Sequence, residues 1–222
     1  MLSPGLLLLA DSRLPAGGHA HSGGAERAIA SGAVHDVPSL ERFLRGRLHT
    51  AGALAAALAA AARAAAVGER PGWELLDEEA DARTASPAQR AASRTQGRLL
   101  LRVARRVFPA EALEELARRT PNPHHPVALG VAAYAAGATA GEAALTAAYH
   151  AVSGPATAAV RLLGLDPVAV HALLAALGPD LAAVAGRAHP PGSWAELPAC
   201  SAPALDLLAE QHARAEVRLF VS

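Results

Sequence analysis

The hydrophobic positions of this 222-residue chain recur at helical spacing, and the two-residue alternation that is typical of β-strands is almost absent. Pro and Gly residues interrupt the pattern and mark where helices start and end. Helices are predicted over residues 4–10, 24–31, 38–67, 74–81, 109–119, 127–137, 141–163, 167–177 and 179–188, with others beginning at Pro87 and near Pro203. The sequence therefore predicts an all-α protein, a single-domain helical bundle of about ten helices that spans residues 1–222.

Two segments of this domain are expected to lie outside the bundle proper. The first is an N-terminal loop over residues 11–24, and the second is a C-terminal docking arm over residues 203–222. The arm carries apolar residues to its last positions, whereas terminal segments are usually polar and frayed. An ending that contains Arg218 and Phe220 predicts docking, either on the protein's own core or on a partner.

Charged residues form two stripes at helical spacing. The acidic stripe contains Glu74, Asp77, Glu78 and Asp81, and the basic stripe that follows contains Arg90, Arg94, Arg98, Arg102 and Arg106. One interpretation is that these are two solvated faces which neutralise each other as an antiparallel helix pair. The other is that they form a docking face for a protein partner.

Composition excludes several classes of protein. Twenty basic residues balance twenty acidic ones, which argues against a nucleic-acid partner. The lone Cys200 excludes an internal disulfide and a thiolate zinc cluster, and it suits a reducing cytoplasm. The apolar run 6–10 is too short for a secretion signal, and the runs 51–62 and 143–160 do not read as membrane spans. With few aromatic residues, the core is expected to consist of Ala, Leu and Val.

Candidate chemistry is sparse. Gly17-Gly18 precedes a helix but lacks the Lys of a phosphate loop, so a tight turn is expected there. His19 and His21, together with Asp11, make a borderline site for transient contact with nickel or zinc. The pair His124-His125 is expected to have a structural role, either capping the amides of the helix that follows or packing against that helix. No serine or cysteine nucleophile motif is present, so the chain is not expected to be an enzyme.

Several motifs in a fixed order resemble the UreF family of urease accessory proteins. An apolar run leads into Leu-Pro-x-Gly-Gly and Ser-x-Gly-x-Glu at residues 14–26, and the chain closes on Arg-Leu-Phe-x-Ser at residues 218–222. Between them lie Arg90, Ser93, Arg94, Gly97 and Arg98, then His124-x-Pro-Val-x-x-Gly130, then Tyr149 with Ser153 and a closing Arg161. The resemblance covers essentially the whole chain.

Two departures from the family pattern stand out. His19 and His21 occupy loop positions where the family commonly has aromatic residues, and Gly154-Pro155 replaces Asn-Gln. Pro155 is expected to kink its helix. The two histidines are the feature that would separate this branch from its relatives.

The resemblance implies a non-catalytic, cytoplasmic homodimer without a cofactor of its own. Such a protein bridges UreD (also called UreH) and the GTPase UreG, and so assists GTP-dependent nickel insertion into apo-urease. The partner-binding residues that it implies are Arg13, Pro15, Gly17, Gly18, Glu26, Tyr149, Arg161, Glu210, His212, Arg218, Leu219 and Phe220. Two alternatives stay open at this point: a metal-dependent hydrolase that uses Asp11, His19 and His21, and a helical adaptor unrelated to urease.

Overall fold

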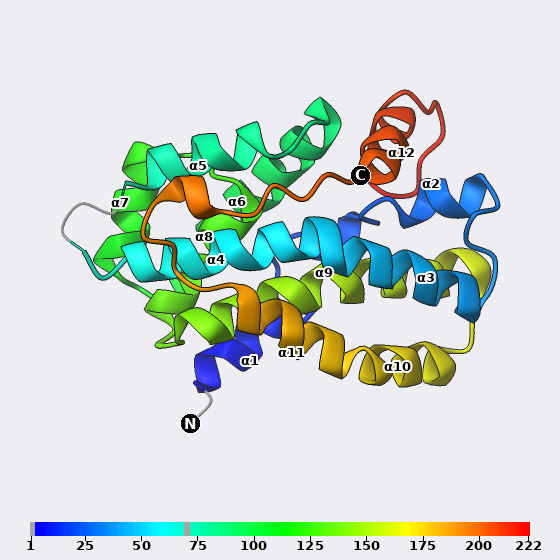
Figure 1. Cartoon of the computed structure of the whole chain (residues 1–222), viewed down its shortest axis with the longest axis horizontal. Helices are drawn as coiled ribbons and strands as arrows, with labels where there is room; N and C mark the ends of the chain where they lie inside the picture. Colours follow the sequence, from blue (N-terminus) through cyan, green and yellow to red (C-terminus); the bar gives the residue numbers. More distant parts are fainter. Residues whose placement is uncertain (1–2, 69–71) are drawn as a thin grey trace.

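The computed structural model describes residues 3–68 and 72–222, and within these ranges it contains helices and no β-strand (Figure 1). The α-helices are α1 (Pro4–Ala10), α2 (Ala25–Ala30), α3 (Val37–Arg47), α4 (Ala53–Ala65), α5 (Trp73–Ala82), α6 (Pro87–Val107), α7 (Glu111–Arg119), α8 (His125–Ala135), α9 (Ala140–Leu163), α10 (Pro167–Ala176), α11 (Gly178–Arg187) and α12 (Pro203–Ala213). The predicted all-α fold is confirmed. A π-helical segment, Leu48–Gly52, joins α3 to α4, and short 3-10 turns lie at Gly18–Ala20 and Trp194–Glu196.

Capping side chains account for several helix starts. Asp36 and Ser39 form a reciprocal capping box at the start of α3, and Thr139 and Glu142 form another at α9. Ser86 accepts a hydrogen bond from the Gln89 amide at the start of α6, as expected of an N-cap followed by Pro. The helix boundaries therefore follow from short local signals.

Helix α4 lies at the centre of the fold and packs on α8 and α9 (Figure 1). Its residues 56–62 are all buried, and all are alanines except Leu58. At Gly130 of α8, a Cβ atom would overlap the carbonyl oxygen of Ala59 and lie 2.7 Å from the Cβ atom of Ala62. Only glycine fits there, so small residues allow the two backbones to meet. The expected Ala, Leu and Val core is confirmed.

Helix α9 continues through Pro155 to Leu163. Proline has no amide hydrogen, so the carbonyl of Ala151, four residues earlier, loses its helical partner. Arg47 supplies the missing donor, because its Nε atom lies 2.8 Å from the Ala151 oxygen. A side chain from the end of α3 thus satisfies the carbonyl that proline leaves free in α9.

The acidic and basic stripes meet between α5 and α6. Arg94 bonds the carboxylates of Asp77 and Asp81 at 2.7 and 2.5 Å, and Arg90 lies 3.8 Å from Asp81. This part of the stripes confirms the interpretation of a neutralising helix pair. The remaining arginines of the basic stripe are exposed and form no ion pair within the described chain; they are Arg98, Arg102 and Arg106.

His124 connects the same helices, and of its two predicted structural roles the structure shows packing between helices and no side-chain cap of α8. Its side chain makes no capping bond; instead Asp77 accepts from the His124 amide at 2.7 Å, and Ser93 Oγ accepts from the His125 amide at 3.1 Å. The His124 ring lies between Ser93 and Asp81, at 3.0 and 2.9 Å. Helix α8 consequently begins at His125, two residues before the predicted start, because neighbouring helices satisfy its first amides.

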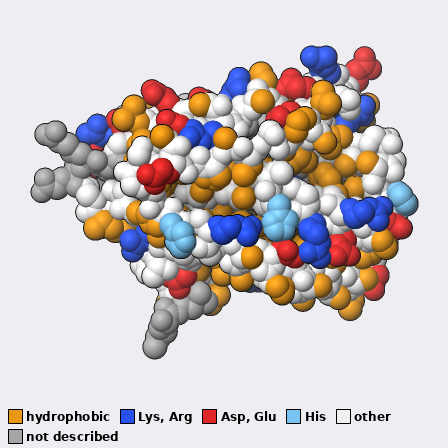
Figure 2. Space-filling view, in the orientation of Figure 1, with side chains coloured by type: hydrophobic (Ala, Val, Ile, Leu, Met, Phe, Trp, Pro, Cys, Tyr) orange, Lys and Arg blue, Asp and Glu red, His pale blue; other side chains and the backbone are white. Residues whose placement is uncertain are grey.

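The connector between α11 and α12 runs across α4 toward α5 (orange in Figure 1). Arg83, at the end of α5, donates hydrogen bonds to the carbonyls of Trp194 and Leu197 and so holds this connector in place. On the same face, charges of both signs are mixed over α3 and α11 (Figure 2), where Arg45 pairs with both Glu41 and Asp180.

One continuous helical stretch, Val37–Ala65, is long and apolar enough to cross a membrane by composition, and 56% of its most apolar segment is buried inside the fold. Helices α10 and α11, bent by 43° at their junction, are long and apolar enough only when taken together. Burial of the first stretch against α8 and α9 fits the core helix of a folded domain.

Candidate partner-binding site

The last nine residues, 214–222, form a tail that folds back against residues 20–26. The amides of Leu219 and Phe220 donate to the carboxylate of Glu26 at 2.8 and 3.1 Å. The Val221 amide donates to the carbonyl of Ala20 at 2.7 Å. The Ser22 amide in turn donates to the Ser222 carbonyl at 2.5 Å. We call this set of contacts between the tail and residues 20–26 the clasp.

Side chains of the tail alternate between the protein and solvent. Phe220 is buried against Ala25 of α2 and Ala158 of α9. Its neighbours point outward, with Leu219 78% exposed and Val221 59% exposed. The sequence left open whether the apolar ending docks on its own core or on a partner. The structure places Phe220 against the protein's own helices α2 and α9, in a small cluster beside the main core, and leaves Leu219 and Val221 uncovered within the described chain.

Two residues of α12 support the tail from inside the chain. His212 is buried, and its Nε2 atom donates to the Phe220 carbonyl at 3.2 Å, because a carbonyl can only accept. Glu210 accepts hydrogen bonds from Ser86 Oγ at 2.6 Å and from the Ala88 amide at 2.9 Å, and these bonds lower the pKa of its carboxyl group. Both predicted partner-binding residues therefore make contacts within the protein.

The loop histidines have different environments. His21 is buried, its Nδ1 atom is hydrogen-bonded to Ser222 Oγ at 2.6 Å, and burial lowers its pKa. His19 is exposed. Asp11 forms an ion pair with Arg13 at 2.7 Å, and the hydrogen bonds from Arg13 lower the pKa of Asp11 to about 2. Over residues 3–68 and 72–222, no three His, Cys, Asp or Glu side chains are grouped so that they could hold a metal ion.

The glycines of the loop form a turn, as predicted. Gly17 has a φ of 78°, in the left-handed region, and precedes the 3-10 turn Gly18–Ala20. A Cβ atom at Gly17 would lie 2.8 Å from the Leu99 side chain of α6, so the loop packs closely on that helix. Pro15 and Arg13 are exposed beside it.

Tyr149 and Arg161 lie on α9 and expose their side chains to solvent. No hydrogen bond or ion pair engages either side chain within the described ranges. The structure thus separates the implied partner-binding residues into two groups. In one group, Glu26 and Phe220 build the clasp, Glu210 and His212 hold α12 beside it, Gly17 and Gly18 form the turn of the loop, and Arg13 pairs with Asp11. In the other group, Pro15, Tyr149, Arg161, Arg218 and Leu219 expose side chains that make no hydrogen bond or ion pair within the described ranges.

Sequence reasoning did not anticipate the backbone pairing between residues 20–22 and 221–222. Backbone hydrogen bonds between two short irregular segments leave no side-chain period to detect. The one signal available was the unusual apolar ending, which predicted docking but not its location.

Comparison with known proteins identifies the family. The UreF family model matches residues 34–178. A urease accessory protein UreF of Mycolicibacterium vanbaalenii is 46% identical over 98% of this chain and 97% of its own length. Proteins of the same name from Mycobacterium marinum and Mycobacterium tuberculosis are 43% and 44% identical, each over 98% of this chain and 97% of its own length. The relatives are accessory proteins rather than enzymes, and the chain belongs to the UreF family of urease accessory proteins.

Proposed function

We propose that this protein is a cytoplasmic, non-catalytic scaffold that bridges UreD and the GTPase UreG and so assists nickel insertion into apo-urease. The proposal follows from the family and from the tail. In this proposal, the C-terminal end of the protein captures UreD, and a homodimer of the protein presents another surface to UreG.

The alternating tail is the observation that carries this proposal. Its backbone is held by Glu26 and by residues 20–22, and Phe220 anchors it to α2 and α9. Leu219, Val217 and Val221 remain exposed at 78%, 87% and 59%. An ordered row of exposed apolar side chains is suited to a protein partner, because its conformational entropy is already reduced before binding.

The N-terminal loop is proposed as the surface that shapes the dimer or meets UreG. Arg13 and Pro15 are exposed on it, and its packing against Leu99 fixes its position relative to α6. Light scattering of the purified protein measures the oligomeric state directly. A strictly monomeric protein at all concentrations would refute the homodimer.

In the proposed role, nickel is cargo and not a resident cofactor. Transient contact with nickel by His19 and His21 stays a prediction. His19 is exposed, whereas His21 is hydrogen-bonded to Ser222, so His19 is the more accessible of the two rings. Substituting both histidines and measuring urease maturation at limiting nickel tests this contact.

Deletion of residues 217–222 tests the role of the tail. We expect the truncated protein to lose capture of UreD in a pull-down assay while keeping its helical circular dichroism spectrum, because the tail lies outside the main core. A truncated protein that still activates urease fully would overturn the role of the tail.

A point variant removes the partner surface without removing the clasp. Leu219→Asp places a charge on an exposed side chain, whose backbone bond to Glu26 is unaffected. We expect at least a tenfold loss of UreD affinity, since a buried unpaired charge at an interface is costly. The matched control is Val168→Asp on α10, where the side chain is 76% exposed, and it should retain capture.

The two alternatives are less well supported. Membership in the UreF family contradicts an adaptor unrelated to urease. A hydrolase site at Asp11, His19 and His21 would need three converging side chains, whereas Asp11 pairs with Arg13 and the ring of His21 faces Ser222.

A further inference from the structure

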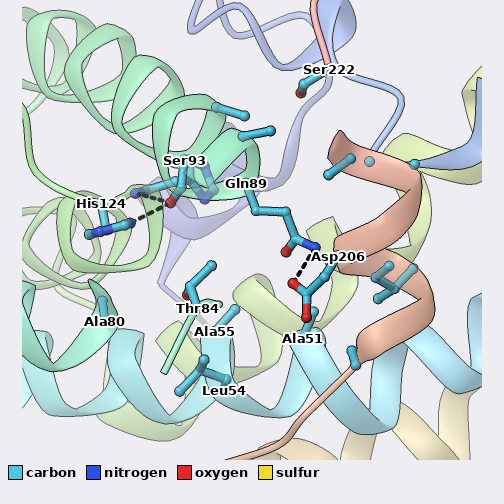
Figure 3. A pocket seen from close by; sticks show the side chains of 18 of the residues that line it. Ala51, Leu54, Ala55, Ala80, Thr84, Gln89, Ser93, His124, Asp206 and Ser222 are labelled. Atoms are coloured by element: carbon cyan, nitrogen blue, oxygen red, sulfur yellow. Dashed lines mark hydrogen bonds between the residues drawn. The ribbon is translucent and has the colours of Figure 1, made fainter. Parts of the chain in front are cut away.

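A cavity of about 600 Å³ lies between α4, α6, α9, α12 and the tail. Figure 3 shows α6 and α12 on opposite sides of it, with the side chains of Ala51, Leu54 and Ala55 projecting from the helix below. Gln89 of α6 is hydrogen-bonded across the opening to Asp206 of α12, at 3.1 Å. Neither the tail contacts nor the proposed UreD surface requires such a space.

Arg47 lines this cavity and has a charge without a partner. The one hydrogen bond recorded for its side chain within the described chain joins Nε to the Ala151 carbonyl, and no carboxylate of that part of the chain lies within ion-pair distance. Burial lowers the pKa of Arg47 to about 10, so the guanidinium remains charged at neutral pH. Arg47 is half-buried, so its unpaired guanidinium meets the open space of the cavity, where it is available to an anion.

The other polar groups of the cavity wall add little further positive charge. The rings of His125 and His150 are tilted by 46° to each other, with centroids 5.9 Å apart, and burial lowers their pKa values to about 3 and about 4. Both rings are therefore neutral at pH 7 and offer only hydrogen bonds. Arg83 is paired with Glu79, and the positive charge of Arg218, which also lines the cavity, is matched by the negative charge of the lining residue Asp206. The arrangement favours an anion of single charge over a multiply charged phosphate.

The apolar side of the cavity continues directly from Arg47 along the same helical stretch. Ala51, Leu54, Ala55 and Leu58 follow Arg47 at spacings of four, seven, eight and eleven residues and line the cavity. At about 1.5 Å per residue, the backbone positions of this row extend roughly 16 Å along the helix axis from Arg47 to Leu58. A cationic head followed by an apolar row is complementary to a carboxylate with an aliphatic chain.

We infer that this cavity binds a short-chain aliphatic monocarboxylate, with the carboxylate on Arg47 and the chain along Ala51, Leu54 and Ala55. The two terminal nitrogens of the guanidinium match the two oxygens of a carboxylate in a bidentate pair. The neutral rings of His125 and His150 lie on the same cavity wall and can donate further hydrogen bonds. The tail lines this cavity through Arg218, Val221 and Ser222, but the inference does not rest on the proposed bridging role.

Calorimetric titration of the full chain with hexanoate tests the inference. Hexanamide, the neutral isostere, is the matched ligand control, and ionic strength is kept constant with chloride. We expect hexanoate to bind at least about tenfold more tightly than hexanamide, because a hydrogen bond to a charged group is the stronger kind. We also expect it to bind more tightly than acetate. Equal binding of hexanoate and hexanamide, or of hexanoate and acetate, would overturn the site.

Three variants locate the binding on the structure. Ala55→Phe fills the cavity without touching Arg47 and should abolish hexanoate binding. Arg47→Met should reduce it at least tenfold, while Arg98→Met, at an exposed arginine of α6, should leave it unchanged. If Arg47→Met does not fold because the Ala151 carbonyl loses its donor, Ala55→Phe still decides the question. Hexanoate binding that survives Ala55→Phe would place the ligand elsewhere and refute the proposal.

Discussion

Two regions hold the protein together by opposite means. One is the contact between α4 and α8, and the other is the clasp. At α4 and α8, small apolar residues let two backbones approach at Gly130. At the clasp, Phe220 is the one large apolar anchor, and the tail is otherwise held by its own amides through Glu26 and residues 20–22. The first region should respond to changes of shape and the second to changes of hydrogen bonding. The first belongs to the main core, whereas the second can open alone.

The largest expected effect is Gly130→Val, which tests the shape of the α4–α8 contact. A Cβ atom there overlaps the Ala59 carbonyl, and a backbone oxygen cannot move aside as a flexible side chain can. We expect a loss of about 3 kcal/mol or more in the free energy of unfolding, measured by urea denaturation. Gly46→Ala in α3 is the control, since a Cβ atom there meets nothing within 4 Å, and it should stabilise by about 0.5–1 kcal/mol.

The second largest effect is expected from acidification, which should destabilise the part of the core that contains the cavity-lining residues His125 and His150. Burial lowers the pKa of His125 to about 3 and that of His150 to about 4, from an ordinary value of 6.5. Below pH 6.5 the unfolded chain takes up protons that the folded chain resists, so stability falls as pH falls. We expect a loss of about 2.5 kcal/mol between pH 7 and pH 5.5 from the two rings together. His150→Gln should flatten the dependence of unfolding free energy on pH, whereas His171→Gln, at an exposed position, should not. Identical slopes for the two variants would contradict the role of buried His150 in this dependence.

Phe220→Ala should weaken the clasp and spare the core. Phe220 belongs to a small cluster with Ala25 and Ala158, separate from the main core. We expect the tail contact to weaken by about 2 kcal/mol, less than the roughly 3–5 kcal/mol usual for a phenylalanine in a main core, because the tail can detach without unfolding the helices. Hydrogen exchange at the Leu219 and Phe220 amides measures this opening. Val221→Ala, at an exposed side chain, is the control. If the Leu219 and Phe220 amides of the Phe220→Ala variant exchange as slowly as those of the wild type, Phe220 is not the anchor.

Glu26→Gln should have the smallest effect of the four. The glutamine side chain keeps one oxygen acceptor for one tail amide, but its NH2 group, which is a donor, then faces the N–H of the other tail amide. We expect a loss of about 1 kcal/mol in clasp stability, detected as faster exchange of the Phe220 amide. Glu111→Gln removes an exposed surface pair with Arg118 and should leave the tail unaffected. Equal effects of the two substitutions would mean that the charge of Glu26 does not hold the tail.

Much of the fold could be predicted because its signals are local. Asp36, Ser86 and Thr139 mark helix starts by their own side chains, and the predicted ranges agree with the observed helices to within a few residues. The start of α8 lies two residues before the predicted one because its first amides are satisfied by Asp77 and Ser93 from other helices. Contacts of that kind depend on tertiary structure and leave no sequence pattern.

The candidate site was predicted less completely than the fold. The importance of the chain ending and of Glu26 could be inferred from the resemblance, and the tight turn at Gly17 from its glycines. The inward position of Phe220 could not, because a six-residue ending is too short to establish which side of a period-two pattern faces the protein. The role of Arg47 was also hidden, since it depends on a proline far along the chain in α9.

The alanine-rich packing of α4 has a consequence for how folding is balanced. An alanine side chain has no rotamers to restrict, so ordering residues 56–62 costs little side-chain entropy beyond that of Leu58. The same residues bury little apolar surface each, so the enthalpy of close backbone contact must supply more of the stability than in a core of large side chains. A protein built in this way should unfold with a heat-capacity change at the low end for its length, which calorimetry can measure.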